Sequence, residues 1–320
     1  MTRPTVGRLR VDGATLHYEV RGRGPLLLLI PGGTGGAAAF DGVADLLADD
    51  YTVASYDPRG LSRSPLDDPE ARQRVNQHAD DAFRLLELLS PGAPARVAGC
   101  SSGAIVALHL LVTHPERTER IVAHEPPVVE ALPDAAEHRA LLARVQDTFR
   151  REGLMPAAAV FAAGLRRPDQ PQTGPGRSET SPGSDVPGDT GAPGDAGAAT
   201  PVAAAAAEGP VGPGEVPSVT ELPPQAAARA ERTMADMPYF LGRIVPSFMA
   251  YAPDVDRLRA LSDRLVLAAG ADSHGELPYR PAAFLAEQFG TELVLFPGGH
   301  TGLTTHPAEF GELLRKVLGA

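Results

Sequence analysis

The chain has 320 residues, of which 43% are hydrophobic, so it can bury one large core or two modest ones. Its net charge of −11 at pH 7, without a visible basic patch, argues against a surface that binds nucleic acid or an anionic membrane. The longest apolar run, residues 25–31, is far too short to span a bilayer, and no apolar run follows the charged first ten residues as it would in a signal peptide.

Strands and helices alternate from the N-terminus onward. Residues 7–11 and 14–20 alternate in hydropathy around an Asp-Gly dipeptide, which predicts a β-hairpin. The continuous apolar run at 26–30 predicts a strand that is buried on both faces, and 51–56 predicts another core strand. Between residues 75 and 89, apolar side chains recur at spacings of four and three, which predicts an amphipathic helix on one face of the sheet.

A glycine-rich loop at 31–36 follows the first buried strand. It lacks the Gly-Lys-Ser/Thr ending of a nucleotide-binding loop, and it lacks Gly-x-Gly-x-x-Gly in register. We therefore interpret it as an oxyanion loop, in which the backbone N–H of Gly33 or Thr34 points at a substrate oxygen. After the strand at 51–56, Asp57 and Arg59 are interpreted as a brace for the neighbouring loops.

The motif Gly99-Cys100-Ser101-Ser102-Gly103 lies between an apolar strand and an apolar helix. Its two glycines permit the close backbone approach of a tight strand-to-helix turn, which exposes Ser101 as the candidate nucleophile. The helix that begins at Ser102 aims backbone N–H groups, including that of Ser102, at a developing oxyanion. The motif therefore predicts nucleophilic catalysis by a serine.

The regular alternation stops after a strand at 120–125. Residues 126–251 predict a mainly helical lid that is inserted between two strands of a core formed by 1–125 and 252–320. Within the lid, 168–223 is dense in Pro, Gly, Ala, Ser and Asp, and we expect disorder there because too little apolar surface is available to offset the ordering entropy. Four lid residues could line an acyl-binding pocket or belong to the lid core: Met237, Tyr239, Phe240 and Phe248.

Two further apolar strands, at 264–270 and 292–296, are followed by Asp272 and His300. Because the carboxyl ends of parallel strands meet at one sheet edge, we expect both side chains near Ser101. An imidazole with an unperturbed pKa of about 6.5 can take the proton of the serine, and Asp272 would orient the ring and stabilise its charged form. Glu125 also ends a strand and is the alternative acid.

Together these motifs resemble the α/β-hydrolase fold, in the lidded branch that contains serine esterases, lipases and perhydrolases. The resemblance covers about residues 8–125 and 252–319. It implies an α/β protein with a mostly parallel, eight-stranded sheet, helices on both faces and an inserted helical lid. The matching segments are Pro31-Gly32-Gly33, Asp57-Pro58-Arg59-Gly60-Leu61-Ser62, the serine motif, Gly270-Ala271-Asp272 and Gly298-Gly299-His300.

Our leading hypothesis is a serine hydrolase that cleaves a small or medium carboxylic ester through an acyl-enzyme, with no metal and no diffusible cofactor. The same triad could instead act as an amidase, thioesterase, carbon–carbon hydrolase or perhydrolase, or the chain could be a binding protein without catalysis. The expected partner is a small-molecule ester, and the expected assembly is a monomer or homodimer. Cys100, the single cysteine, excludes an internal disulfide and favours a reducing compartment, so we expect a cytoplasmic protein.

Overall fold

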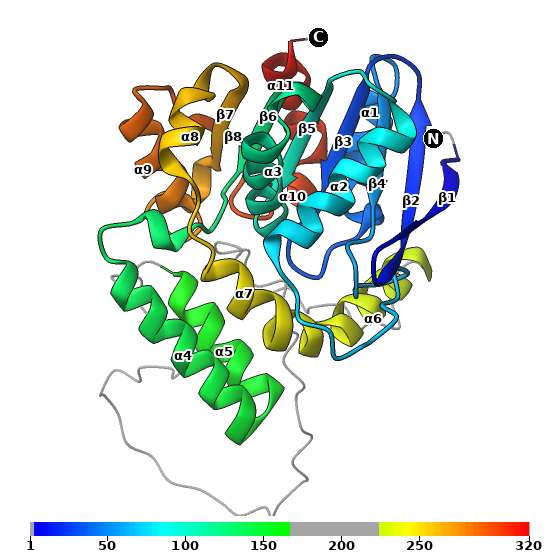
Figure 1. Ribbon diagram of the computed structural model, residues 1–320. Helices are drawn as coiled ribbons and strands as arrows, with labels where there is room; N and C mark the ends of the chain where they lie inside the picture. Colours follow the sequence, from blue (N-terminus) through cyan, green and yellow to red (C-terminus); the bar gives the residue numbers. More distant parts are fainter. Residues whose placement is uncertain (1–2, 167–223, 320) are drawn as a thin grey trace, which may run out of the picture.

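The computed structural model describes residues 3–166 and 224–319, and its centre is an eight-stranded sheet in the order β1-β2-β4-β3-β5-β6-β7-β8 (Figure 1). β2 runs antiparallel to β1 and β4, and all other neighbouring pairs are parallel. The mostly parallel α/β architecture expected from the sequence is therefore confirmed. The strands are β1 (Thr5–Val11), β2 (Ala14–Gly22), β3 (Leu26–Ile30), β4 (Thr52–Tyr56), β5 (Ala95–Cys100), β6 (Thr118–His124), β7 (Leu265–Gly270) and β8 (Val294–Phe296).

The strands form where the hydropathy pattern predicts them. β1 and β2 make the expected hairpin, in which Val11 pairs with Ala14 across the Asp-Gly turn. β3 is buried at all five positions because β4 and β5 flank it and helices cover both faces of the sheet. The catalytic candidates follow β5, β6 and β8, so the carboxyl ends of these parallel strands position them.

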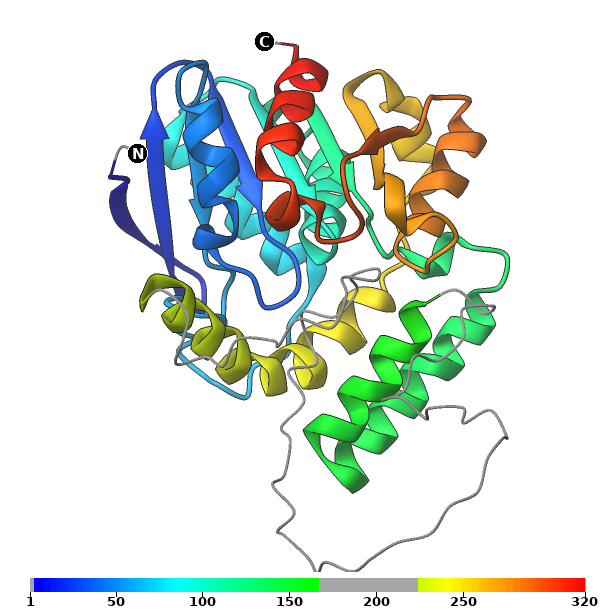
Figure 2. The same cartoon turned by 180° about the vertical axis from the view of Figure 1, so that it is seen from behind.

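Helices cover the two faces of the sheet in separate layers (Figures 1 and 2). One apolar cluster packs residues of α2, α3, α8 and α9 against the sheet, and a second cluster packs residues of α1, α10 and α11 against the opposite face. The first layer consists of α2 (Val75–Leu89), α3 (Ser102–Thr113), α8 (Val255–Ala260) and α9 (Tyr279–Phe289). The second consists of α1 (Asp41–Leu47), α10 (Gly302–Thr305) and α11 (Pro307–Leu318).

Side-chain patterns explain how α2 and α3 pack. α2 buries the apolar positions with the predicted spacing, including Val75, Ala79 and Leu86, and is amphipathic as expected. α3 is apolar nearly all round and is buried along most of its length, because it lies between the sheet and its neighbouring helices. At 12 residues it is too short to span a bilayer, and no other helix in the described ranges has the length and hydropathy to do so.

The lid is inserted between β6 and β7 and lies beyond the sheet edge where β6 ends (Figure 1). An apolar cluster packs its Leu141 and Val145 with Leu241 and Met249, and Leu277 of the core joins this cluster. The segment at 168–223, for which disorder is expected, lies outside the described residues. The described lid elements are α4 (Ala135–Glu152), α5 (Leu154–Leu165), α6 (Pro224–Tyr239), the π-helical turn η5 (Phe240–Ile244) and α7 (Val245–Met249).

A buried histidine, His124, ends β6 and faces the second layer of helices. Its ring lies edge-on to Phe296 and Phe310, with centroid distances of 5.6 and 5.3 Å. Within the described part of the chain, neither ring nitrogen has a hydrogen-bond partner. Removal from water lowers the pKa of His124 to about 4, so the ring is neutral at pH 7.

The substitution His124→Phe is expected to reduce acid sensitivity. Because the pKa in the folded state lies below the unfolded value of about 6.5, the unfolded chain binds the proton first and stability is lost as pH falls from about 6.5 towards 4. Phenylalanine does not bind a proton, so the variant avoids this loss in the free energy of unfolding, which is about 2 kcal/mol at pH 5. Urea unfolding at pH 7 and pH 5 measures the difference. The exposed His274 gives the matched control His274→Phe, and an equal pH response in both variants would contradict the prediction.

Candidate active site

Ser101 lies in a strained turn between β5 and α3. Its backbone φ is 53° and ψ is −124°, in a region that residues other than glycine seldom adopt. Both flanking glycines are required by close backbone contacts, since a Cβ at Gly99 would lie 2.4 Å from the carbonyl oxygen of Gly103, and a Cβ at Gly103 would lie 2.3 Å from that of Ile30. The local structure is therefore the strand-to-helix turn that the motif predicts.

The neighbouring cysteine has the opposite character. Cys100 is buried, and burial together with the negative charge of Glu125 raises the pKa of its thiol to about 12. A thiol that stays protonated is a poor nucleophile. Ser101 is thus the better placed of the two nucleophilic side chains.

His300 connects Ser101 to a carboxylate. Its Nε2 atom lies 3.1 Å from Ser101 Oγ, and its Nδ1 atom lies 2.5 Å from Glu125 Oε2. Because a carboxylate is an acceptor, the proton of this second contact is on Nδ1 when the ring is neutral, which leaves Nε2 free to accept the proton of Ser101. Ser101, His300 and Glu125 are therefore connected by two consecutive hydrogen bonds.

Glu125 is fully buried, directly after β6, and its backbone φ is 48°. Its Oε1 atom accepts from the backbone N–H of Gly270, at 2.8 Å, and from the hydroxyl of Ser273. Burial on its own would raise the pKa of this carboxyl, but the hydrogen bond and charge of His300, with the hydroxyl of Ser273, lower the pKa below its usual value. The carboxylate is ionised at neutral pH.

Our preference for Asp272 as the partner of His300 is wrong, because Glu125 occupies that place. Asp272 and Ser273 lie on the same short turn after β7, which runs from Ala271 to Ser273. This turn directs the hydroxyl of Ser273 inward to Glu125 and leaves Asp272 on the exposed side, with its backbone N–H bonded to the carbonyl oxygen of Gly298 at 3.0 Å. Glu125, our alternative acid, makes the hydrogen bond to the imidazole.

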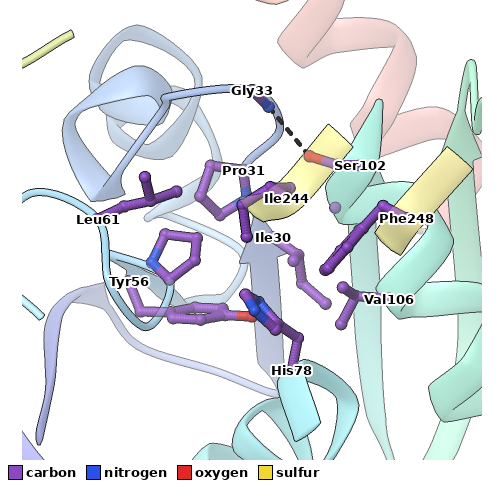
Figure 3. Close-up of a pocket in the computed structure, with 12 residues that line it drawn as sticks. Ile30, Pro31, Gly33, Tyr56, Leu61, His78, Ser102, Val106, Ile244 and Phe248 are labelled. Carbon is purple, nitrogen blue, oxygen red and sulfur yellow. Dashed lines mark hydrogen bonds between the residues drawn. The ribbon is translucent and has the colours of Figure 1, made fainter. Parts of the chain in front are cut away.

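The glycine-rich loop brings one backbone donor to the start of α3. The N–H of Gly33 donates to Ser102 Oγ over 3.0 Å (Figure 3). Gly33 has a φ of 61°, which glycine adopts without strain. Of the two loop candidates, Gly33 and Thr34, it is Gly33 whose N–H contacts α3.

Asp57 holds the far end of this loop, as the brace interpretation expects. The side chain is fully buried, and its Oδ1 atom accepts from the backbone N–H of Ala37 at 2.8 Å. Its Oδ2 atom accepts from Arg63 Nε at 2.7 Å. Arg59 instead forms a bidentate pair with Asp81 on α2, at 2.5 and 2.6 Å, and so ties the same region to the core.

A small cavity of about 10 Å³ adjoins Gly33 and Ser102 (Figure 3). This volume is close to that of one water probe. Of the four lid candidates, Phe248 lines the cavity, and the hydroxyl of Tyr239 lies close over Gly60. Met237 and Phe240 pack with the lid cluster. Other apolar lining residues are Ile30, Leu61, Val106 and Ile244.

The site can perform acid–base chemistry with side chains alone. No group of three histidine, cysteine or acidic residues within 3–166 and 224–319 is arranged to hold a metal ion. The sequence did not predict that the N–H of Gly270 and the hydroxyl of Ser273 donate hydrogen bonds to Glu125. The only sequence signal for Ser273 is its position just after a strand end, which many surface serines share.

Comparisons with known proteins agree with the fold. A family model described as alpha/beta hydrolase fold matches residues 25–211. The uncharacterised hydrolase YraK of Bacillus subtilis is 33% identical over 317 residues, which cover 98% of this chain and 95% of its own length. A zearalenone hydrolase of Bionectria ochroleuca is 35% identical over 119 residues, which cover 36% of this chain and 45% of that protein.

Solved structures show the same fold at low sequence identity. A hydrolase from Pseudomonas aeruginosa PA01 has a TM-score of 0.63 and 20% identity, and the match covers 98% of each chain. A thermophilic esterase from Thermogutta terrifontis has a TM-score of 0.64 and 17% identity over 99% of this chain and 98% of its own. At these identities the likenesses show a shared fold.

Proposed function

Because the chain belongs to the α/β-hydrolase family, we propose that it is a serine hydrolase that cleaves small or medium carboxylic esters through an acyl-enzyme. The observation that carries this proposal is the position of His300, whose two ring nitrogens contact Ser101 and Glu125. The relative that spans the chain and the fungal relative are both named hydrolases, which supports hydrolysis as the reaction type.

Acylation begins when Ser101 Oγ attacks the ester carbonyl carbon and His300 Nε2 takes the hydroxyl proton. The carbonyl π electrons move to oxygen and form a tetrahedral oxyanion, which backbone N–H groups of Gly33 and Ser102 would stabilise. When the oxyanion collapses, the bond to the alcohol oxygen breaks and His300 returns the proton to that oxygen. The products of this half-reaction are the free alcohol and an acyl group on Ser101.

Deacylation repeats these steps with water. His300 removes a proton from a water molecule, whose oxygen attacks the acyl carbon, and then gives the proton back to Ser101 Oγ as the carboxylic acid leaves. Throughout both halves, the buried charge of Glu125 stabilises the imidazolium that forms on His300. No step needs a group from outside the chain other than substrate and water.

Substrate size follows from the cavity beside the oxyanion loop. Its apolar lining suits a short hydrocarbon group, and its small volume means that a bound acyl chain must displace side chains of the lid. Phe248, which is 3% exposed and lies edge-on to His78, is the largest lid side chain in this lining. We infer that Phe248 limits the length of the acyl chain.

Labelling with a fluorophosphonate tests the nucleophile. The folded wild-type protein is expected to gain the mass of one phosphonyl group on Ser101, because activated serines react with this probe and unactivated ones do not. Ser101→Ala is expected to remain unlabelled and to lose several orders of magnitude in kcat for 4-nitrophenyl butyrate. Intact-mass measurement and peptide mapping identify the site. A folded wild-type protein that stays unlabelled would falsify the proposed function.

Substitutions that remove a negative charge test which carboxylate is the acid of the proposed triad. Glu125→Gln keeps the size of the side chain but removes the charge that stabilises the imidazolium, so kcat is expected to fall by about 10³- to 10⁴-fold. Asp272→Asn is the matched control on the neighbouring turn and is expected to stay within about threefold of wild type. Steady-state kinetics compares the two, with circular dichroism to verify folding. The reverse ranking would return Asp272 to the role of acid.

Phe248→Ala tests the limit on acyl length. The ratio of kcat/KM for 4-nitrophenyl octanoate to that for the acetate is expected to rise by about tenfold or more, because each additional methylene that can be buried favours binding. Phe240→Ala is the control, since Phe240 also belongs to the lid but packs against Phe161 at 6.3 Å between ring centroids. An equal rise in both variants would indicate general loosening of the lid instead.

A further inference from the structure

The N–H that the oxyanion site requires from the glycine-rich loop is already engaged within the protein. It donates to the side-chain oxygen of Ser102 over 3.0 Å (Figure 3). The backbone N–H of Ser102 belongs to the first turn of α3, which follows Ser101 directly. A substrate oxygen that reaches both N–H groups therefore also approaches the hydroxyl of Ser102.

The chemistry of this hydroxyl determines what it can do there. A serine hydroxyl has one proton to donate and two lone pairs that accept. The contact with Gly33 uses a lone pair, so the proton remains available for another acceptor. Among the hydrogen bonds of the described residues, none runs from the Ser102 hydroxyl to another protein group. The side chain is only 9% exposed and borders the same cavity as Gly33, which limits its access to bulk water.

We propose that the side-chain hydroxyl of Ser102 is a third donor to the oxyanion, beside the backbone N–H groups of Gly33 and Ser102. This inference rests on the proposed acyl transfer at Ser101. In the free enzyme, the oxygen of Ser102 keeps the Gly33 N–H directed towards α3. When negative charge develops on the substrate oxygen, the Gly33 N–H transfers its hydrogen bond from Ser102 Oγ to that oxygen, and the hydroxyl of Ser102 donates its own proton to it as well.

Two substitutions of Ser102 remove the donor with little change in volume. Ser102→Ala deletes the hydroxyl, and Ser102→Cys replaces it with a thiol, which is a weak donor. Both are expected to lower kcat for 4-nitrophenyl butyrate by about 10²-fold, within the range measured when one oxyanion donor is lost, with little change in KM. Ser262→Ala is the control, because Ser262 is a half-buried serine in the turn before β7, at the end of that strand away from the site.

A pair of inhibitors separates transition-state binding from binding in the pocket. An alkyl trifluoromethyl ketone forms a hemiketal with Ser101 and places a negative oxygen in the oxyanion site, whereas the matching methyl ketone remains a neutral ketone. Loss of the hydroxyl is expected to weaken the trifluoromethyl ketone by about 10²-fold and the methyl ketone by less than about threefold. The preference for the trifluoromethyl ketone over the methyl ketone is the quantity to compare.

The proposal is overturned if both variants keep the wild-type preference for the trifluoromethyl ketone, or if both ketones weaken equally. If Ser102→Ala fails to fold, loss of the preference for the trifluoromethyl ketone in Ser102→Cys supports the proposal by itself. Fluorophosphonate labelling of wild type and variants separates this result from the fate of the proposed function. If Ser101 is labelled and the preference is unchanged, acyl transfer stands and only the role of the Ser102 hydroxyl is lost.

Discussion

The buried carboxylate of Glu125 is the constraint on which the geometry of the site depends. An ionised carboxylate inside a protein is costly unless hydrogen bonds replace its hydration. Glu125 is fully buried and accepts from three donors, which lie on β7, on the turn after β7 and on the loop after β8. These bonds stabilise the charge and at the same time fix the relative position of three strand ends. The imidazole of His300 is oriented as a consequence of satisfying Glu125.

Backbone strain at the site is held by the adjacent strands. Ser101 and Glu125 have φ values of 53° and 48°, conformations that cost about 1 to 3 kcal/mol each. The N–H of Ser101 donates to the carbonyl oxygen of His124 at the end of β6, and the N–H of Glu125 donates to that of Ala268 in β7. Each strained residue is therefore tied to the next parallel strand. The backbone hydrogen bonds that pair the strands thus continue to Ser101 and Glu125, and they fix the positions from which these two side chains extend.

Most of the fold and two members of the candidate triad could be predicted from sequence, because they depend on local patterns. Continuous apolar runs identify buried strands, and the glycines around Ser101 require a tight turn at any strand edge. The choice between Glu125 and Asp272 depends instead on the rotation of a three-residue turn, which sends Ser273 inward. The hydropathy pattern of the sequence contains no information on the rotation of this turn. The separation of lid residues into cavity lining and lid core likewise depends on tertiary packing.

The loop from residue 57 to residue 73 links the lid to the glycine-rich loop at 31–36. Its first residue, Asp57, accepts from the N–H of Ala37 at the end of the glycine-rich loop, whereas the N–H of Ser62 donates to Asp236 on α6 at 2.9 Å. At its other end, the carbonyl oxygen of Gln73 accepts from Ser247, the residue before Phe248, at 2.5 Å. A displacement of Phe248 would therefore act on the loop that bonds the glycine-rich loop. The lid and the glycine-rich loop are thus connected through side-chain hydrogen bonds at both ends of one loop.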